Sequence, residues 1–266
     1  MLKANADNRT IGLAARSGGT LRIFQVLLFV GILLLWYGLT KSGILPKFFF
    51  GEPIAVFRCV IDWVLSGEIF YHLGITLLET IFGFLIGAGL ALVCGLWFAL
   101  SPTASALSDP YIKALNAMPR VILAPIFSLW FGLGIWSKVA LGVTLVFFVV
   151  FFNVYQGIRE VSPVVLANAR MLGASKKQLL RTVYLPSATS WVFSSLHTSV
   201  GMAFVGAVVG EYLGSSAGVG YLILQAEGVF DVNTVFAGIM VLTISALLLD
   251  GVVSIVETRL LKWQPG

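Results

Sequence analysis

The chain has 266 residues, of which 58% are hydrophobic and 11% charged, and its mean hydropathy is +0.97. Because a water-soluble domain carries about 25% charged residues, this composition excludes a water-soluble fold and predicts an all-helical protein embedded in a membrane. The formal charge of +5 does not indicate nucleic-acid binding, since the basic residues are concentrated in a few connections between apolar segments.

The first 22 residues form a basic tail before an apolar segment. The tail contains Lys3, Arg9, Arg16 and Arg22, and no small-residue cleavage site follows the apolar segment. We therefore expect a cytoplasmic tail over 1–22, followed by an uncleaved first membrane helix.

Several segments are long and apolar enough to cross a bilayer, which takes about 20 residues. Five are clear: 23–40, 75–100, 139–158, 188–210 and 232–256. A sixth, 114–133, contains Pro119, Arg120 and Pro125, so we expect this span to be kinked or broken. The sequence thus predicts one transmembrane domain over 23–256 and a second cytoplasmic tail over 257–266.

The charges between these spans predict their orientation, because cytoplasmic flanks are enriched in Lys and Arg. The N-terminal tail, the 159–187 connection and the C-terminal tail are all basic, whereas the 211–231 connection has Glu211, Glu227 and Asp231 and no basic residue. Six spans with both termini in the cytoplasm satisfy this pattern, as in a multi-pass protein of a bacterial inner membrane.

A shorter amphipathic helix is predicted over Pro53–Ser66, with Pro at its first position. Arg58, Asp62 and Ser66 form one polar stripe, and Trp63 suits a membrane interface. The helix either lies along the outer interface or caps the helix bundle.

Small residues mark one face of two spans. They are Gly83, Gly87, Ala91 and Gly95 in the second span, and Gly201, Gly206, Gly210 and Gly214 in the fifth. Such faces allow close helix packing. The small-residue face of the second span is either a static packing face or a sliding or subunit-contact face, and we expect the fifth span to lie inside the bundle.

Cys59 and Cys94 lack metal-ligand spacing and are interpreted as small hydrophobic residues.

The 159–187 connection contains strong local signals for a helix, a tight turn and a second helix. Ser162 and Pro163 start the first helix and Gly173 stops it. Ser175 and Gln178 have capping-box spacing, and we expect the second helix to end at Leu185 and Pro186. Its apolar residues pack either on a partner protein or on the chain's own spans: Leu166, Met171, Leu172, Leu179 and Leu180.

These residues resemble the EAA loop of binding-protein-dependent ABC importer permeases. The resemblance implies a type I importer permease fold in which this loop forms coupling helices that dock on an ATPase subunit. The residues that match this loop are Ala167, Asn168, Ala169, Arg170, Leu172, Gly173, Ala174, Ser175 and Pro186. One position departs from the pattern, because the usual first Glu is absent around Ala169.

The region around the third span is similar to the nitrate, sulfonate and taurine branch of that family, through Met118-Pro119, Ala124-Pro125 and the Trp130–Gly134 run. The resemblance, over about 21–263, implies several partners: two copies of an ABC ATPase that binds ATP and Mg, a second, identical permease copy, and a periplasmic or lipid-anchored substrate-binding protein. It also implies alternating-access import of a small anion, such as a sulfonate, taurine, nitrate or an aromatic acid.

The chain has no GxxxxGK[ST], HExxH or CxxC motif. We therefore expect no catalytic residue, cofactor or metal site here and ATP hydrolysis in a separate subunit. One alternative is a membrane-embedded enzyme using Glu79, Arg120 and Asp250. Another is a passive channel or an assembly scaffold.

Charged residues within spans are costly and face protein or water. Arg120 either lines an anion path or forms an ion pair with Glu79 or Asp250, and Glu79 stands where the family commonly has Arg. The other polar candidates for the substrate path are Asn153, His197 and Thr198, with interhelical hydrogen bonding as the alternative role.

Overall fold

The computed structural model describes residues 18–260, apart from the side chains at 18, 19, 187–190, 194 and 260, and in this range every regular element is a helix. Residues 1–17 of the predicted N-terminal tail and 261–266 of the C-terminal tail lie outside the described residues. The helices are α2 (Gly18–Lys41), α3 (Lys47–Phe50), α4 (Pro53–Ser66), α5 (Glu68–Leu100), α6 (Pro102–Ala117), η1 (Arg120–Ile122), α7 (Leu123–Phe131), α8 (Ile135–Arg159), α9 (Pro163–Met171), α10 (Lys176–Leu179), the π-helical turn η2 (Leu180–Tyr184), α11 (Leu185–Leu213), α12 (Val219–Gly228) and α13 (Val232–Leu260).

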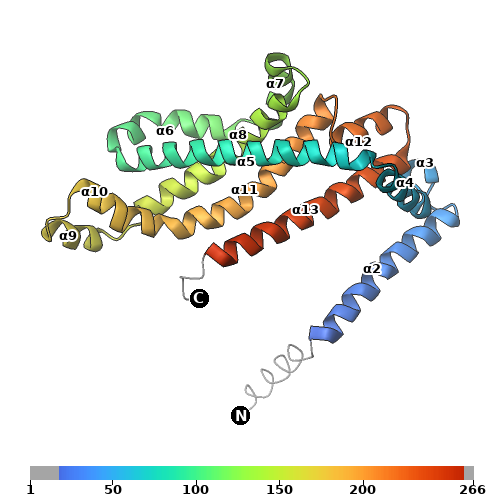
Figure 1. Ribbon diagram of the computed structural model, residues 1–266, viewed down its shortest axis with the longest axis horizontal. Helices are drawn as coiled ribbons and strands as arrows, with labels where there is room; N and C mark the ends of the chain where they lie inside the picture. Colours follow the sequence, from blue (N-terminus) through green and yellow to red (C-terminus); the bar gives the residue numbers. More distant parts are fainter. Residues whose placement is uncertain (1–17, 261–266) are drawn as a thin grey trace, which may run out of the picture.

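Three long helices, α5, α8 and α11, pack together along the centre of the molecule (Figure 1). The small-residue face of α5 lies directly on α8: a Cβ on Gly87 would be 2.9 Å from Val146 Cβ, and a Cβ on Gly83 3.4 Å from Gly142 Cα. On α11, a Cβ on Gly206 would be 2.7 Å from Gly142 Cα. The small residues therefore serve close packing within this chain, and α11 lies inside the bundle as predicted.

The two ends of the bundle carry different elements. Figure 1 shows α9 and α10 at one end, and α3, α4 and α12 at the other, while α2 extends away from the remaining helices. In α4, Pro53 and Val56 are buried, whereas Arg58 and Asp62 on its polar stripe are exposed. The helix packs on α13, as expected for a cap on the bundle, and its polar stripe faces away from the chain. Its placement along the outer interface stays a prediction.

Five helices (α2, α5, α8, α11 and α13) are long and apolar enough to cross a membrane, and their positions confirm the five clear spans. Some of the predicted spans were shorter than the helices that contain them. α2 begins at Gly18 rather than 23, α5 begins at Glu68 rather than 75, and α13 runs to Leu260 rather than 256. The 33 residues of α5 make a helix of roughly 50 Å, longer than the bilayer core of about 30 Å. The hydropathy pattern located the membrane-embedded part, whereas the helix continues beyond it.

The sixth predicted span, 114–133, is broken as expected, but its first half begins at Pro102 rather than at 114. Pro102–Ala117 and Arg120–Phe131 form a pair bent by 77°, which is a broken span or a re-entrant loop. The break falls at Met118, which Pro119 restricts to an extended conformation (φ −70°, ψ 133°). The prediction missed the first half because α6 is polar on its surface, with an exposed Lys113–Asp109 ion pair of 2.6 Å.

Candidate functional site

The first helix of the predicted coupling loop ends at a glycine turn. Pro163 occupies the first turn of α9, after Ser162, and Gly173 has a φ of +80°. The Gly173 N–H donates to Arg170 O (3.0 Å) and the Ala174 N–H to Ala169 O (3.1 Å), which satisfies the last carbonyls of the helix. Gly173 is therefore required here by its left-handed backbone conformation.

The second helix begins with the predicted capping box. The Ser175 hydroxyl accepts from the Gln178 N–H (3.3 Å), and the Ser175 N–H donates to Gln178 Oε1 (2.8 Å). This reciprocal pair closes the start of α10.

The prediction that this second helix ends at Leu185 and Pro186 was wrong. The chain continues from α10 through the π-helical turn into α11, and the Leu185 N–H donates to Leu180 O, five residues back. A π turn changes the hydrogen-bond register, which lets the helix continue into Pro186, a residue without an N–H. α10, the π-helical turn and α11 therefore form one continuous helical segment.

The apolar residues of this loop divide into two groups. Met171 and Leu172 are 80% and 89% exposed, whereas Leu179 is 6% exposed and Leu180 is half-buried. The α10 side packs on the chain's own helices, and the turn after α9 projects from the end of the bundle (Figure 1). The other predicted coupling residues are exposed (Ala167, Asn168, Arg170, Gly173, Ser175 and Pro186) or half-buried (Ala169 and Ala174).

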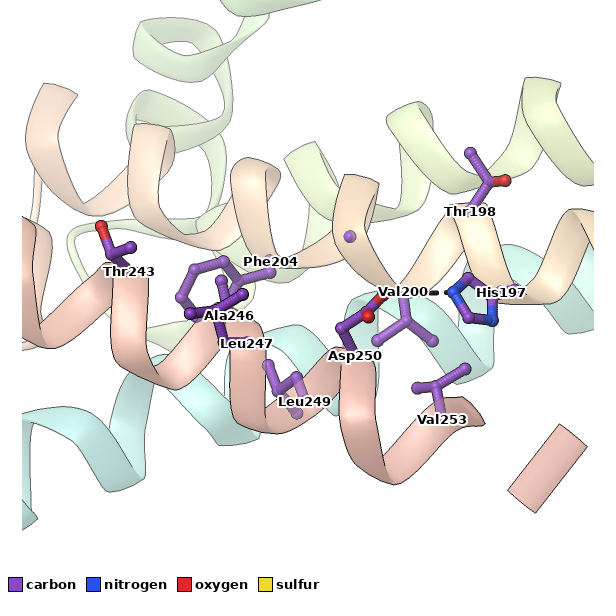
Figure 2. A pocket seen from close by; sticks show the side chains of 11 residues that line it. His197, Thr198, Val200, Phe204, Thr243, Ala246, Leu247, Leu249, Asp250 and Val253 are labelled. Atoms are coloured by element: carbon purple, nitrogen blue, oxygen red, sulfur yellow. Dashed lines mark hydrogen bonds and ion pairs between the residues drawn. The ribbon is translucent and has the colours of Figure 1, made fainter. Parts of the chain in front are cut away.

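A pocket of about 360 Å³ lies between α11 and α13. Figure 2 shows its apolar walls, with Phe204 from α11 and Leu249 and Val253 from α13, and its polar end at His197 and Asp250. His197 Nε2 is 3.1 Å from Asp250 Oδ1, and Nδ1 is 2.7 Å from Glu257 Oε2. The imidazole thus links α11 to α13 through two carboxylates.

The structure brings together only two of the four residues predicted for a substrate path. Thr198 adjoins His197 and contributes to the pocket lining, although its side chain points away from α13 in Figure 2. Asn153 on α8 donates to Val149 O (2.8 Å), a bond within its own helix. Asn153 and Arg120 do not line this pocket.

The alternative of an Arg120 ion pair with Glu79 or Asp250 was wrong, since Arg120 has no carboxylate partner in the described part of the chain. Its guanidinium donates to the Asn116 carbonyl and side chain and lies 4.6 Å from the Phe148 ring centre. The hydrogen bonds satisfy part of the charge, and the aromatic face provides a cation–π contact.

Glu79 is instead fully buried in a polar cluster beside Glu211 and Lys138. Thr76 Oγ1 donates to Glu211 Oε1 (2.6 Å), and the Gly220 N–H donates to Glu211 Oε2 (2.7 Å). Lys138 Nζ donates to Leu133 O (2.7 Å) and Gly134 O (3.1 Å). The cluster fixes α12 against α5, α8 and α11.

Neither the contribution of Lys138 nor the partners of Glu79 were predicted. The clue available was the Gly218-Val219-Gly220 run after Glu211, which indicates close backbone approach. Glu79, Arg120 and Asp250, the groups of the alternative enzyme hypothesis, have separate partners and do not form one site.

The apolar helical bundle and its broken span define a polytopic membrane protein. Residues 83–262 match the family of binding-protein-dependent transport system inner membrane components. The chain belongs to this family and is the permease subunit of an ABC importer, in which a separate subunit hydrolyses ATP.

Named relatives cover most of the chain. One is a permease of Bacillus subtilis named for aliphatic sulfonates transport, 35% identical over 88% of this chain and 84% of that protein. A formylaminopyrimidine transport permease of Halalkalibacterium halodurans is 31% identical (90% of this chain, 94% of the relative). The taurine transport permease of Escherichia coli is 26% identical over 90% of each chain.

Solved structures agree on the fold. The inward-facing methionine ABC transporter matches with a TM-score of 0.56 at 18% identity, over 75% of this chain and 95% of the other. An amino acid ABC transporter matches with a TM-score of 0.59 at 19% identity, over 75% and 97%. These likenesses establish the type I importer permease fold.

Proposed function

We propose that this chain forms, with a second identical copy, the translocation path of an importer for a small anionic solute, and that the α9–α10 turn docks on the ATPase. The observation that carries the docking assignment is the exposed Leu172, 89% accessible beside a rigid glycine turn. An apolar side chain at the tip of a capped, hydrogen-bonded turn suits insertion into a partner's groove.

The charges at the two ends support the orientation. Arg170, Lys176, Lys177 and Arg181 lie around the α9–α10 turn, whereas Glu68, Glu227 and Asp231 lie at the opposite end. Basic flanks mark the cytoplasmic face. We therefore place the α9–α10 turn and both termini in the cytoplasm, with α4 and α12 facing the periplasm and a substrate-binding protein there.

The continuous helix from α10 into α11 supports a mechanism of coupling. Two ATPase copies that close on ATP and Mg would move the α9–α10 turns, and the π turn would carry this displacement into α11. Because α11 also forms the wall of the pocket at His197 and Thr198, such a movement would change access to that pocket. Alternating access to the two faces follows from this lever action.

Relatives named for the transport of aliphatic sulfonates and of taurine support a solute with an anionic sulfonate group. Arg120 is the cation we assign to the path, because no carboxylate neutralises it in the described part of the chain. We place Asn153 as a polar residue on the same route, from its position on α8.

The docking assignment is tested by Gly173→Val. Nothing lies within 4 Å of a Cβ added at Gly173, so the substitution strains only the left-handed turn, at a cost of about 1 kcal/mol or more. We expect weaker pull-down of the ATPase by the purified permease and lost coupling of ATP hydrolysis to uptake in proteoliposomes, without loss of membrane insertion.

Gly43→Val is the matched control, because Gly43 has a φ of +79° and the same open surroundings but lies at the opposite end of α2 from the cytoplasm. It should have the same small effect on thermal stability and none on ATPase association. Normal association and coupled uptake by the Gly173→Val protein would refute the docking assignment.

A further inference from the structure

A groove of about 660 Å³ opens at the end of the molecule opposite the α9–α10 turn. It is formed by α4, the start of α5, and the turn from α12 into α13. Trp63, Glu68, Gln225, Val229 and Asp231 are among its lining residues. In this lining, which lies wholly in the described part of the chain, the charged side chains are the carboxylates of Glu68 and Asp231.

The two carboxylates of this groove belong to different elements, Glu68 to the start of α5 and Asp231 to the turn before α13, and both line the same hollow. Cys59 on α4 contacts that turn, since its Sγ lies 3.6 Å from Thr234 Oγ1. Asp231 also caps α13, since its Oδ1 accepts from the Thr234 N–H (3.2 Å) and its Oδ2 from the Thr234 hydroxyl (2.6 Å). The Glu68 carboxylate is exposed and has no ion-pair partner among the described residues.

The chemistry of the groove fits a basic side chain from outside. An Arg or Lys can place its aliphatic stem against Trp63 and Val229 and its charged head between two carboxylates, with the indole adding a cation–π attraction. Gln225 adds an amide oxygen as a further acceptor. The exposed Val229 (74%) and Phe230 (72%) beside the groove provide apolar contact area for the surface that carries such a side chain.

The sign of the charge selects among possible occupants. Anionic lipid headgroups would be repelled by Glu68 and Asp231, and a symmetric contact of this groove with the same groove of a second copy would bring like charges together. A small anionic solute is disfavoured for the same reason. A soluble protein with a basic surface residue remains.

We propose that this groove receives an Arg or Lys side chain of the solute-binding protein and thereby fixes its position on the outer face of the permease. The inference rests on the proposed function for the existence of that partner. It assigns to Glu68 the role of the accessible anionic contact, while Asp231 combines contact with capping of α13.

The test measures binding of the purified solute-binding protein encoded with this permease to the permease–ATPase complex in nanodiscs. Glu68→Lys should weaken binding at least tenfold, and Glu68→Gln should weaken it about threefold, since each removes or reverses the partner's counter-charge. The wild-type affinity should fall as salt rises, and this dependence should be smaller for Glu68→Gln.

Asp62→Lys is the matched control, because Asp62 is also exposed near the groove but does not line it. It should change the affinity less than threefold. ATPase pull-down and basal hydrolysis should stay unchanged in all variants, so a failure of the proposed function would appear as missing ATPase association already in the wild type.

Equal affinity of wild type and Glu68→Lys would overturn the proposal, and so would an equal loss in Asp62→Lys. Should Glu68→Lys reduce insertion, the near-isosteric Glu68→Gln decides alone. If Glu68→Lys instead increases association of the complex with vesicles of anionic phosphatidylserine and leaves the binding protein's affinity unaltered, the groove faces a membrane surface and the proposal is wrong.

Discussion

Two glycines with left-handed backbones, at opposite ends of the bundle, show how differently the two ends are built. Gly173 has a φ of +80°, and a Cβ built on it would meet no atom within 4 Å, whereas Gly218 has a φ of +108° and a Cβ built on it would overlap the Glu211 carboxyl group. The α9–α10 end leaves its turn free. The α12 end locks its turn into a buried polar cluster of the same chain.

This difference indicates that backbone strain alone does not identify a partner surface. At Gly218 the chain itself fills the space: the Gly218 N–H donates to His72 Nδ1 (3.0 Å) and the Val219 N–H donates to Thr76 Oγ1 (3.1 Å). At Gly173 the neighbouring Leu172 is left to solvent. The first arrangement stabilises the fold, and the second is available for binding.

The largest effect is expected in a labelling experiment that tests whether the two ends of the bundle lie on opposite sides of the membrane. Single cysteines at Ser175 and Ser216, both exposed, in a chain with Cys59 and Cys94 replaced, should react with a membrane-impermeant maleimide from opposite faces. In intact spheroplasts only the Ser216→Cys protein should be labelled, and permeabilisation should expose the other. Labelling of both before permeabilisation would contradict the orientation.

A second pair of substitutions compares the two glycines directly. Gly218→Ala should destabilise the protein by about 3 kcal/mol, because it combines strain with a clash against Glu211. Gly173→Ala should cost only about 1 kcal/mol, since the added methyl group meets no neighbour. Thermal unfolding in detergent and abundance in membranes provide the measurements. Equal destabilisation by both substitutions would show that the Gly218 turn is not locked.

The smallest effect on stability is expected for a substitution at Leu172, and comparing it with one at Leu179 distinguishes the exposed from the buried apolar residues of the α9–α10 loop. Leu172→Asp should leave the melting temperature nearly unchanged while weakening ATPase association at least tenfold, because Leu172 is 89% exposed. Leu179→Asp should instead destabilise the protein by several kcal/mol, because it places a charge at a site only 6% exposed. If Leu172→Asp lowers the melting temperature as much as Leu179→Asp does, the loop packs on its own chain.

Local signals predicted the turn between α9 and α10 correctly. The capping box of Ser175 and Gln178 spans three residues, and the stop at Gly173 depends on its own φ, so neighbouring sequence is sufficient to specify both. The end of the second helix was mispredicted for a related reason: Pro186 normally stops a helix, but the π turn before it restores continuity.

The sequence alone determined four features: the membrane-embedded fold, the five clear spans, the charge asymmetry between connections and the capped turn. These features depend on hydropathy, charge and short-range hydrogen bonds, which act within a few residues. Only the tertiary structure decided the partners of the charged groups inside the bundle. The Thr76–Glu211 hydrogen bond joins residues 135 positions apart, and Arg120 turned to Asn116 and Phe148 rather than to a carboxylate. Such choices depend on which helix faces meet, and close packing at Gly83, Gly142 and Gly206 sets that arrangement.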